Sequence, residues 1–189
     1  MIRATAIVLA LAAGVPVMAT GAATAAKVDG LPAPMSIESA FSPYAQAQAL
    51  VLKVIASASS DIRLAAYSFS SPAVLAAKQR GVDVRVLADY RRNRKRINLD
   101  ALDALAGAGI AVRTIDAYAM HHDKYMVVDG QTVQNGSFNY THDAAVANSE
   151  NVLVVWHNVP LAQSYIAHWE SRWQRGKDYR PQPLTGSGS

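Results

Sequence analysis

The chain of 189 residues contains no cysteine, so disulfide bonds and thiolate chemistry are excluded and stability must come from a packed core. It also contains no internal repeat, so any motif that it carries occurs once. Apolar residues make up 51% of the chain. This length and apolar content suit one globular α/β domain rather than two.

The N-terminal segment lacks charge almost entirely and does not resemble part of this domain. Arg3 is the only charged residue before Lys27, and an apolar, alanine-rich run follows it over residues 4–17. A short positive region, an apolar run and small residues after it are typical of a cleavable signal peptide. A membrane anchor is the alternative, but the run is short for a span of about 20 residues. We predict a signal peptide over 1–26 and a periplasmic or secreted protein without stable membrane association.

Acidic residues are in slight deficit, and the basic excess is unevenly placed. The whole chain has 18 Lys and Arg against 14 Asp and Glu, a net charge of +4. Cleavage of the predicted signal peptide would remove Arg3 and lower the net charge to +3. Five basic residues follow a predicted strand directly: Arg91, Arg92, Arg94, Lys95 and Arg96. Such a run is often only a solvated loop. Because it lies at the carboxyl end of a strand, where α/β sheets place their sites, we favour contacts with nucleic-acid phosphates.

Apolar periodicity predicts the order of helices and strands. Helices are expected over 43–58, 72–79, 99–107 and 161–173, and strands over 61–69, 82–88, 110–115, 124–128, 131–137 and 151–156. Pro43 is expected in the first turn of the first helix. The early alternation of strands and helices predicts parallel strands joined by crossover helices. Asp129-Gly130 predicts a tight hairpin turn.

These elements predict a single α/β domain with a mixed, mostly parallel sheet flanked by helices on both faces. We place the domain at 41–180, after an extended lead-in at 27–40 and before a flexible tail at 181–189. The aromatic side chains of the last helix fall on one face, which indicates core packing rather than a ligand platform.

The predicted hairpin brings four polar side chains together. With a two-residue turn, Val128 faces Gln131, and counting outward places His122 opposite Ser137. Alternation along the strands then predicts that His122, Lys124, Ser137 and Asn139 project from one face. The imidazole can act as a nucleophile or proton carrier near neutral pH. The ammonium, hydroxyl and amide can hold the non-bridging oxygens of a phosphate.

This pattern of residues resembles the HKD signature of the phospholipase D superfamily with its GSxN extension. The matching positions are His122, Lys124, Asp129, Gly136, Ser137 and Asn139. The likeness extends from about residue 41 to residue 179. It is greatest to small bacterial EDTA-resistant endonucleases that carry one HKD motif per chain.

The resemblance implies phosphodiester hydrolysis without a metal or another cofactor. His122 would attack phosphorus and form a covalent phosphohistidine, which water then resolves. A second histidine would act as general acid and then as general base. Lys124 and Asn139, assisted by Ser137, would stabilise charge on the phosphoryl oxygens.

Two acidic residues are candidates for supporting roles. Asp129 belongs to the signature of the family, but the hairpin places it at the turn, away from the phosphate, which indicates a structural role. Glu150 precedes a predicted strand and is a candidate for orienting a catalytic imidazole. It is equally a candidate for a local cap or ion pair.

The single HKD motif predicts the assembly. Members of this superfamily usually carry two such motifs in one long chain, and this chain has one. A homodimer with His122 from each subunit at a shared cleft on the twofold axis would supply the pair of histidines.

The other histidines admit simpler interpretations. His121, His122 and Asp123 suggest metal ligands, but adjacent strand residues point to opposite faces, so the two imidazoles would not easily share an ion. The three remaining histidines are scattered, and we interpret them as structural or solvated.

The favoured function is endonucleolytic cleavage of DNA with little sequence preference, and RNA remains an alternative substrate. A phospholipase D that acts on lipid headgroups is the second hypothesis. It requires an apolar membrane-facing surface, which nothing beyond the signal peptide supplies. A non-catalytic nucleic-acid-binding module is the third hypothesis, and it leaves the HKD arrangement unexplained.

Overall fold

A computed structural model of the protein describes residues 33–44 and 46–181, so the predicted signal peptide and all but the first residue of the predicted tail lie outside it. The strands are β1 (Ser36–Ser42), β2 (Asp61–Ala66), β3 (Asp83–Asp89), β4 (Ala111–Ile115), β5 (Lys124–Val128), β6 (Thr132–Gly136), β7 (Glu150–Trp156) and β8 (Lys177–Asp178). The α-helices are α1 (Gln46–Ser57), α2 (Leu75–Gln79), α3 (Arg96–Gly107), α4 (His142–Val146) and α5 (Val159–Trp173). Two 3₁₀ turns are η1 (Pro72–Val74) and η2 (Arg92–Arg94).

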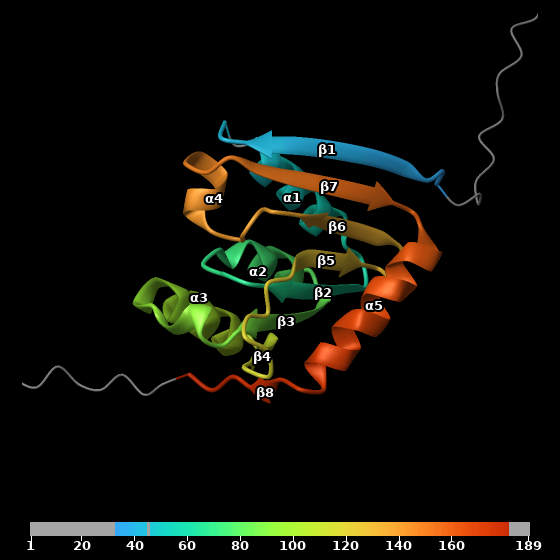
Figure 1. The fold of residues 1–189 in the computed structure, drawn as a ribbon. Helices are drawn as coiled ribbons and strands as arrows, with labels where there is room; N and C mark the ends of the chain where they lie inside the picture. Colours follow the sequence, from blue (N-terminus) through green and yellow to red (C-terminus); the bar gives the residue numbers. More distant parts are fainter. Residues whose placement is uncertain (1–32, 45, 182–189) are drawn as a thin grey trace, which may run out of the picture. The chain divides into compact units, whose positions relative to one another are not determined.

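The strands form one mixed sheet in the order β1-β7-β6-β5-β2-β3-β4-β8 (Figure 1). β2, β3 and β4 are parallel neighbours, as the crossovers through α2 and α3 require. The other five pairs among the described residues are antiparallel. The predicted mixed sheet is confirmed, but it is less parallel than expected, because the hairpin β5-β6 and the strands around it reverse direction.

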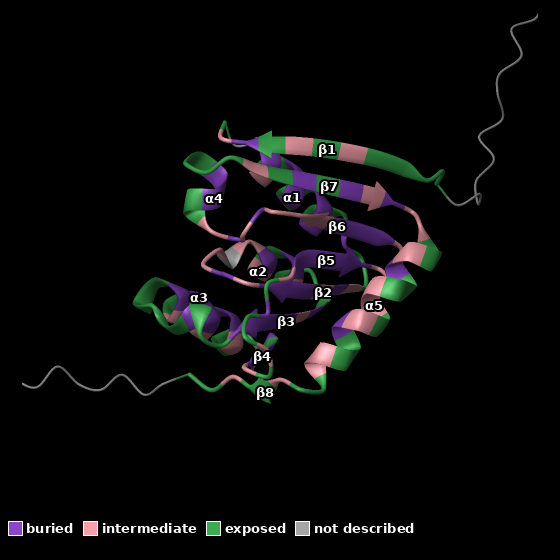
Figure 2. Ribbon diagram, in the orientation of Figure 1, coloured by how far each residue is buried: buried purple, intermediate pink, exposed green. Residues whose placement is uncertain are grey.

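Helices cover both faces of the sheet, as predicted. α1, α2, α3 and α4 lie on one face, and α5 crosses the other (Figure 1). Alternate strand residues feed the two cores: Leu64 and Met126 pack on the first face, and Ala65 and Val127 pack under α5. Trp169 of α5 is buried there, and its indole N–H donates to the Leu64 carbonyl at 3.0 Å. Figure 2 shows the buried central strands and the more exposed β1 edge.

Several boundaries differ from the prediction. The sheet starts at Ser36, inside the expected lead-in, because β1 pairs with β7 along its whole length. The first helix begins at Gln46, so Pro43 precedes it and does not occupy its first turn. β8 and α4 were not predicted, since each is shorter than the periodicity that reveals an element. In residues 33–44 and 46–181, no helix is long and apolar enough to cross a membrane.

Candidate functional site

The β5-β6 hairpin turns where predicted, but its register is shifted by one residue. Asp129 and Gly130 have φ values of 52° and 62°, as a type I′ turn requires. The Gln131 N–H donates to the Val128 carbonyl at 3.1 Å, which closes the turn. The ladder nevertheless begins with Val128 opposite Thr132, because the Gln131 carbonyl accepts from the Asn158 N–H at 2.7 Å. Gln131 is therefore an extra residue on this strand, as in a β-bulge.

This shift overturns the predicted common face. Lys124 pairs with Ala66, and continuing the observed ladder places it across from Gly136. The predicted register, with Val128 opposite Gln131, would have placed it across from Asn135. Ser137 comes next along the chain, so its side chain leaves the sheet on the opposite face. The candidate residues therefore share one end of the hairpin, not one face. Glu150 connects the two groups, because it accepts a hydrogen bond from Ser137 and lies close enough to Lys124 to affect its charge.

An imidazole and an ammonium meet at this open end. Lys124 Nζ lies 3.3 Å from His122 Nε2 and donates to the His122 carbonyl at 2.9 Å. The Tyr67 ring packs edge-on against the His122 ring at 4.4 Å between centroids, and Lys124 Nζ is 4.9 Å from the Tyr67 centroid. His122 is exposed, whereas Lys124 is buried. A substrate can therefore reach the imidazole while the ammonium stays fixed beside it.

The environment of Lys124 shifts its ionisation. Burial lowers the pKa of Lys124, because it disfavours the charged form, and the carboxylates of Glu150 and Asp123 partly offset this effect. The ammonium therefore loses its proton at a lower pH than an exposed lysine does. Glu150, which accepts a hydrogen bond from Ser137, therefore also acts on the ionisation of Lys124.

Ser137 and Glu150 form a hydrogen-bonded pair. Ser137 Oγ donates to Glu150 Oε2 at 2.6 Å and accepts from the Asn151 N–H at 3.0 Å. Glu150 Oε1 accepts from Asn148 Nδ2 at 2.9 Å. Among the described residues, no imidazole is a hydrogen-bond partner of Glu150, so within one chain it orients the Ser137 hydroxyl instead.

Asn139 has a buried oxygen without a partner among the described residues, and Gly136 lies where two strands approach closely. Asn139 Oδ1 is buried and has no hydrogen-bond partner within residues 33–44 and 46–181. A buried polar atom left unpaired is rare in a folded protein and here adjoins the candidate site. Gly136 has a φ of 154°, and a Cβ on it would lie 2.2 Å from the Asn151 carbonyl oxygen. This close approach of two strands explains the glycine in the motif.

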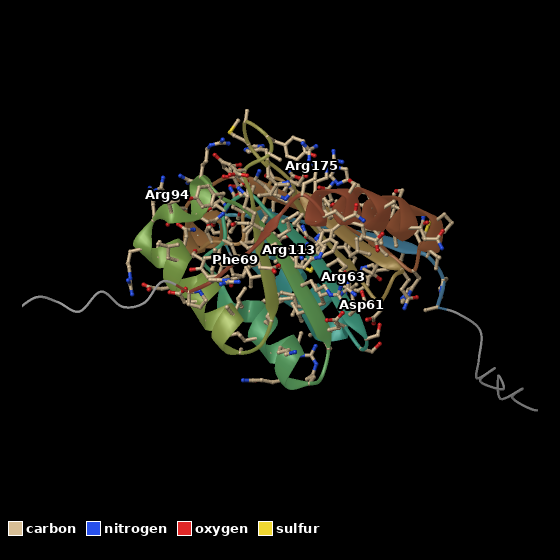
Figure 3. The ribbon with its side chains drawn as sticks, turned by 90° about the horizontal axis from the view of Figure 1, so that it is seen from below. Asp61, Arg63, Phe69, Arg94, Arg113 and Arg175 are labelled. Atoms are coloured by element: carbon tan, nitrogen blue, oxygen red, sulfur yellow. The ribbon has the colours of Figure 1, made fainter. Side chains whose placement is uncertain are left out.

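Asp129 lies at the opposite end of the hairpin. Its carboxylate accepts from five groups, the N–H and hydroxyl of Ser59, the N–H and hydroxyl of Ser60 and the Asp61 N–H, at 2.8 to 3.2 Å. Burial opposes ionisation, but these hydrogen bonds lower the pKa of Asp129 to about 2. At about 3.3 Å per residue, the five steps from Lys124 to Asp129 span roughly 16 Å along the strand. Figure 3 shows Asp61 at this end of the sheet and Arg94 at the other. The placement supports the predicted structural role.

Sequence reasoning missed a cluster of titratable side chains around Asp123, which includes His168. Asp123 Oδ2 lies 3.3 Å from His121 Nδ1 and 4.0 Å from His168 Nε2, and the Tyr125 hydroxyl lies 2.8 Å from His168 Nδ1. Burial lowers the pKa of His121, although Asp123 opposes this shift. His168 lines, together with His122, a cavity of about 420 Å³. Only the packing of α5 across the sheet brings it there, so no local sequence signal reveals it.

The structure also places the residues that suggested a metal. His121 is buried while His122 is exposed, and they point into different surroundings. Across the described residues, no three His, Cys, Asp or Glu side chains are grouped to hold an ion.

Buried polar residues position the loops of the site. Asp89, at the end of β3, accepts from the His121 N–H at 2.8 Å and from the Arg92 N–H at 2.7 Å. Asn93 Nδ2 donates to the Tyr67 carbonyl at 2.9 Å. These bonds tie the loops after β2, β3 and β4 together and anchor the backbone of Tyr67.

The predicted basic patch consists of residues in different settings. The Arg92 guanidinium lies 5.7 Å from the centroid of the Tyr67 ring, which also packs against His122. Arg91 instead donates to the Tyr118 carbonyl at 2.7 Å and braces a loop. Of the five, Arg92 is therefore the one that contacts a residue packed against His122.

The remaining three basic residues lie farther along the same edge. The Arg94 guanidinium is 5.7 Å from the Tyr90 ring centroid. Arg96 pairs with Asp100 at 2.7 Å, and Lys95 is exposed just before α3. They are exposed, and they extend the positive edge away from the hairpin.

Comparison with known proteins identifies relatives for most of the chain. Residues 51–173 match the family described as cardiolipin synthase, PLD-like domain. A phospholipase D from Rickettsia prowazekii is 33% identical over 141 residues, which cover 72% of this chain and 67% of that protein. A mitochondrial cardiolipin hydrolase from Danio rerio is 34% identical over 148 residues, which cover 74% of this chain and 61% of that protein. The chain thus matches about two thirds or less of the length of these relatives.

Solved structures share the fold. The crystal structure of Nuc, a phospholipase D family member from Salmonella typhimurium, has a TM-score of 0.77 and 44% identity, and covers 78% of this chain and 99% of its own. NucT from Helicobacter pylori has a TM-score of 0.68 at 20% identity, with 77% and 100% covered, which shows the fold alone. These likenesses confirm the resemblance found in the sequence.

Proposed function

The chain belongs to the phospholipase D superfamily of phosphodiester hydrolases, and we propose that it is a metal-independent endonuclease that cleaves DNA in a homodimeric site. The observation that carries this proposal is the contact between His122 and Lys124. An exposed imidazole lies 3.3 Å from a buried ammonium, so a nucleophile and a cation for the same phosphate are held together.

In the proposed mechanism, each side chain at the open end has one role. His122 Nε2 attacks phosphorus, the N–P bond forms, and the P–O bond to the leaving alkoxide breaks. A second imidazole protonates that alkoxide and then takes a proton from the water that cleaves the phosphohistidine. Lys124 and Asn139 hold the non-bridging oxygens, and Ser137, oriented by Glu150, donates a further hydrogen bond. Asp129 supports the hairpin.

The second imidazole is His122 of the partner subunit. An exposed apolar patch beside the site supports such a dimer: Ile37, Phe41 and Leu153 are 62%, 60% and 42% exposed on the face that α5 leaves open. Phe41 pairs with Asn151, whose N–H donates to Ser137 Oγ. A second copy that covers this patch would bury apolar surface next to both sites.

DNA is the favoured substrate because the accessible edge of the site is basic. Arg92 lies beside Tyr67, and Arg94 and Lys95 continue the positive edge. Such residues contact the sugar-phosphate backbone without reading the base sequence. RNA would meet the same groups.

The apolar, Arg3-containing N-terminal sequence supports a periplasmic or secreted location.

Lipid phosphodiesters are the second candidate, because relatives are named phospholipase D and mitochondrial cardiolipin hydrolase. Plasmid DNA and cardiolipin vesicles should be tested side by side in EDTA with the wild type and His122→Ala. We expect the wild type to cut DNA and His122→Ala to be inactive. Activity on vesicles alone, or DNA binding without cleavage, would refute the nuclease. DNA cleavage that occurs only when EDTA is left out would refute its metal independence.

The dimer has its own test. Phe41→Asp places a charge in the apolar patch and should give a monomer by light scattering, with plasmid cleavage lost although His122 is intact. Tyr44→Asp, at a residue 87% exposed nearby, is the matched control and should stay dimeric and active. An active monomer would contradict the shared site and turn attention to His168 as the second histidine.

A further inference from the structure

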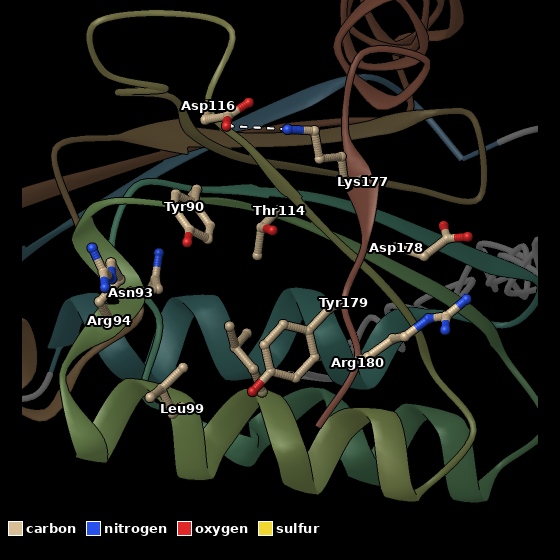
Figure 4. A pocket seen from close by; sticks show the side chains of 11 residues that line it. Tyr90, Asn93, Arg94, Leu99, Thr114, Asp116, Lys177, Asp178, Tyr179 and Arg180 are labelled. Atoms are coloured by element: carbon tan, nitrogen blue, oxygen red, sulfur yellow. Dashed lines mark hydrogen bonds and ion pairs between the residues drawn. The ribbon is translucent and has the colours of Figure 1, made fainter. Parts of the chain in front are cut away.

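A cavity separate from the His122 site lies between β4, α3, the segment that follows β3, and β8 with the residues after it. Its volume is about 460 Å³, within the range of sites that bind small molecules. Figure 4 shows Tyr90, Thr114 and Tyr179 pointing into this space, with Arg94 at one end and Arg180 at the other. Apolar side chains of α3 line the opposite side.

The two tyrosines give the cavity fixed aromatic surfaces. Tyr90 is 44% exposed, and its N–H donates to the Ile115 carbonyl at 3.0 Å. The Tyr179 hydroxyl donates to Asp103 Oδ1 at 2.5 Å, and its N–H donates to the Val112 carbonyl at 2.9 Å. Both backbones are therefore anchored to β4, so the rings need little ordering when a planar group stacks on them.

Two cations at the ends of the cavity are available for an anion. Among the described residues, Arg94 and Arg180 have no acidic partner, whereas Lys177 pairs with Asp116 at 3.3 Å. Arg94 also lies over the Tyr90 ring at 5.7 Å. Aromatic rings beside unpaired arginines are the combination that binds single-stranded nucleic acid, because bases stack and phosphates meet the cations.

A continuous basic and aromatic edge joins this cavity to the site. His122 packs on Tyr67, Tyr67 lies under Arg92, and Arg94 lies over Tyr90. The edge crosses from β5 over β2 and β3 to β4. At about 4.8 Å per strand, the two ends are about 14 Å apart. One flexible strand can therefore occupy both.

We propose that the cavity is an accessory site for one nucleoside of a single-stranded stretch of the nucleic-acid substrate. The base stacks on Tyr90 and Tyr179, and the flanking phosphates meet Arg94 and Arg180. This inference rests on the proposed function, because only a polymeric substrate reaches both places. The cavity would therefore favour substrates long enough to reach it from the His122 site, and it would take no part in bond cleavage.

The test measures the binding of a fluorescent single-stranded oligonucleotide of about 20 residues by anisotropy, in the full chain carrying His122→Ala so that it is not cut. Tyr90→Ala should raise Kd roughly 5- to 100-fold, the loss of one stacked base. Tyr90→Phe, which keeps the ring, and Tyr44→Ala, at an exposed tyrosine elsewhere, should bind like the parent. A dinucleotide is too short to span the edge, so its Kd should not respond to Tyr90→Ala.

Arg94→Gln provides a second variant that does not alter the rings. Loss of one phosphate contact should flatten the slope of log K against log salt by about 0.7 for a single strand. Thermal melting confirms that each variant is folded. Unchanged oligonucleotide binding by Tyr90→Ala refutes the inference, as does equal weakening of dinucleotide binding. Binding to cardiolipin vesicles is measured with the same variants. If Tyr90→Ala weakens binding to the vesicles but not to the oligonucleotide, the inference is refuted and the cavity is assigned to lipid.

These outcomes are distinct from failure of the proposed function. Anisotropy does not require cleavage, so the effect of Tyr90 can be read even if plasmid cleavage in EDTA fails. Conversely, cleavage abolished by His122→Ala together with binding unaffected by Tyr90→Ala supports the nuclease and rejects the accessory site.

Discussion

The two ends of the β5-β6 hairpin differ in how far their polar groups are satisfied. At the turn, Asp129 accepts from five donors, and its pKa falls to about 2. At the open end, burial lowers the pKa of Lys124, and Asn139 Oδ1 has no partner among the described residues. The turn is arranged for stability, whereas the open end keeps groups in a state that a bound phosphate would relieve.

Both ends belong to the same sequence motif. Membership of a motif therefore does not distinguish a residue that performs chemistry from one that holds the hairpin. The distinction comes from where each side chain finds its partners: the partners of Asp129 are in the protein, and those of Lys124 and Asn139 are expected in the substrate.

The largest effect tests the open end directly. His122→Ala should lower kcat for plasmid cleavage by about 10⁴- to 10⁶-fold, because the nucleophile is removed. Its unfolding free energy should change by less than about 0.5 kcal/mol, since His122 is exposed. His142→Ala, at another exposed histidine, is the control and should leave both quantities unchanged. Retained cleavage by His122→Ala would break the comparison.

The charge beside the imidazole comes next. Lys124→Met should lower kcat by about 10²- to 10³-fold, since one stabilising donor is lost. Because burial lowers the pKa of Lys124, wild-type kcat should fall with rising pH at a lower pH than an exposed lysine would give. Lys124→Arg stays charged at high pH, so its slower reaction should lack that alkaline decline. A pH profile that is the same for wild type and Lys124→Arg would contradict this role.

A substitution at Gly136 tests how closely β6 and β7 approach each other at the open end. In Gly136→Ala the new Cβ would lie 2.2 Å from the Asn151 carbonyl oxygen, so β6 and β7 must separate. We expect a loss of about 2–4 kcal/mol in the unfolding free energy, measured by urea denaturation. Gly107→Ala, where a Cβ meets nothing within 4 Å, is the control and should not destabilise. Equal stability of both variants would argue against the close approach.

The smallest effect belongs to the turn. Asp129→Asn removes charged acceptors and should cost about 1–2 kcal/mol of stability, with kcat of the folded enzyme altered less than tenfold. The folded pKa of about 2 lies below the ordinary 3.8, so the contribution of Asp129 is present above pH 3.8 and is lost as pH falls toward 2. The difference between wild type and Asp129→Asn should shrink over that range. A kcat loss as large as that of Lys124→Met would assign the turn to catalysis.

The sequence predicted the elements that have strong local signals. Asp129-Gly130 identified the hairpin, and spacing around it identified the residues of the open end. It did not predict the register, because Gln131 is displaced by a bond to Asn158, which the rest of the sheet brings there. The shift places Ser137 on the face opposite Lys124, but Glu150 still contacts Ser137 and affects the charge of Lys124.

Long-range packing accounts for the other differences. His168 reaches the site only because α5 crosses the sheet, and Tyr67 does so only because β2 lies next to β5. β1 and β8 lie at the edges of the sheet, where exposure removes the apolar alternation that marks a strand. The basic residues were found from their charge, but which of them adjoins His122 depends on the Asp89 and Asn93 bonds after β3.

The most direct test is to look for the covalent intermediate. The reaction with DNA in EDTA is stopped in alkaline denaturant, and peptides are analysed by mass spectrometry. We predict that a nucleotide is bound through an N–P bond to His122 in the wild type and in Asp129→Asn, and that His122→Ala carries no such adduct. An adduct on another residue, or one that persists in His122→Ala, would contradict the assignment of the chemistry to the open end of the hairpin.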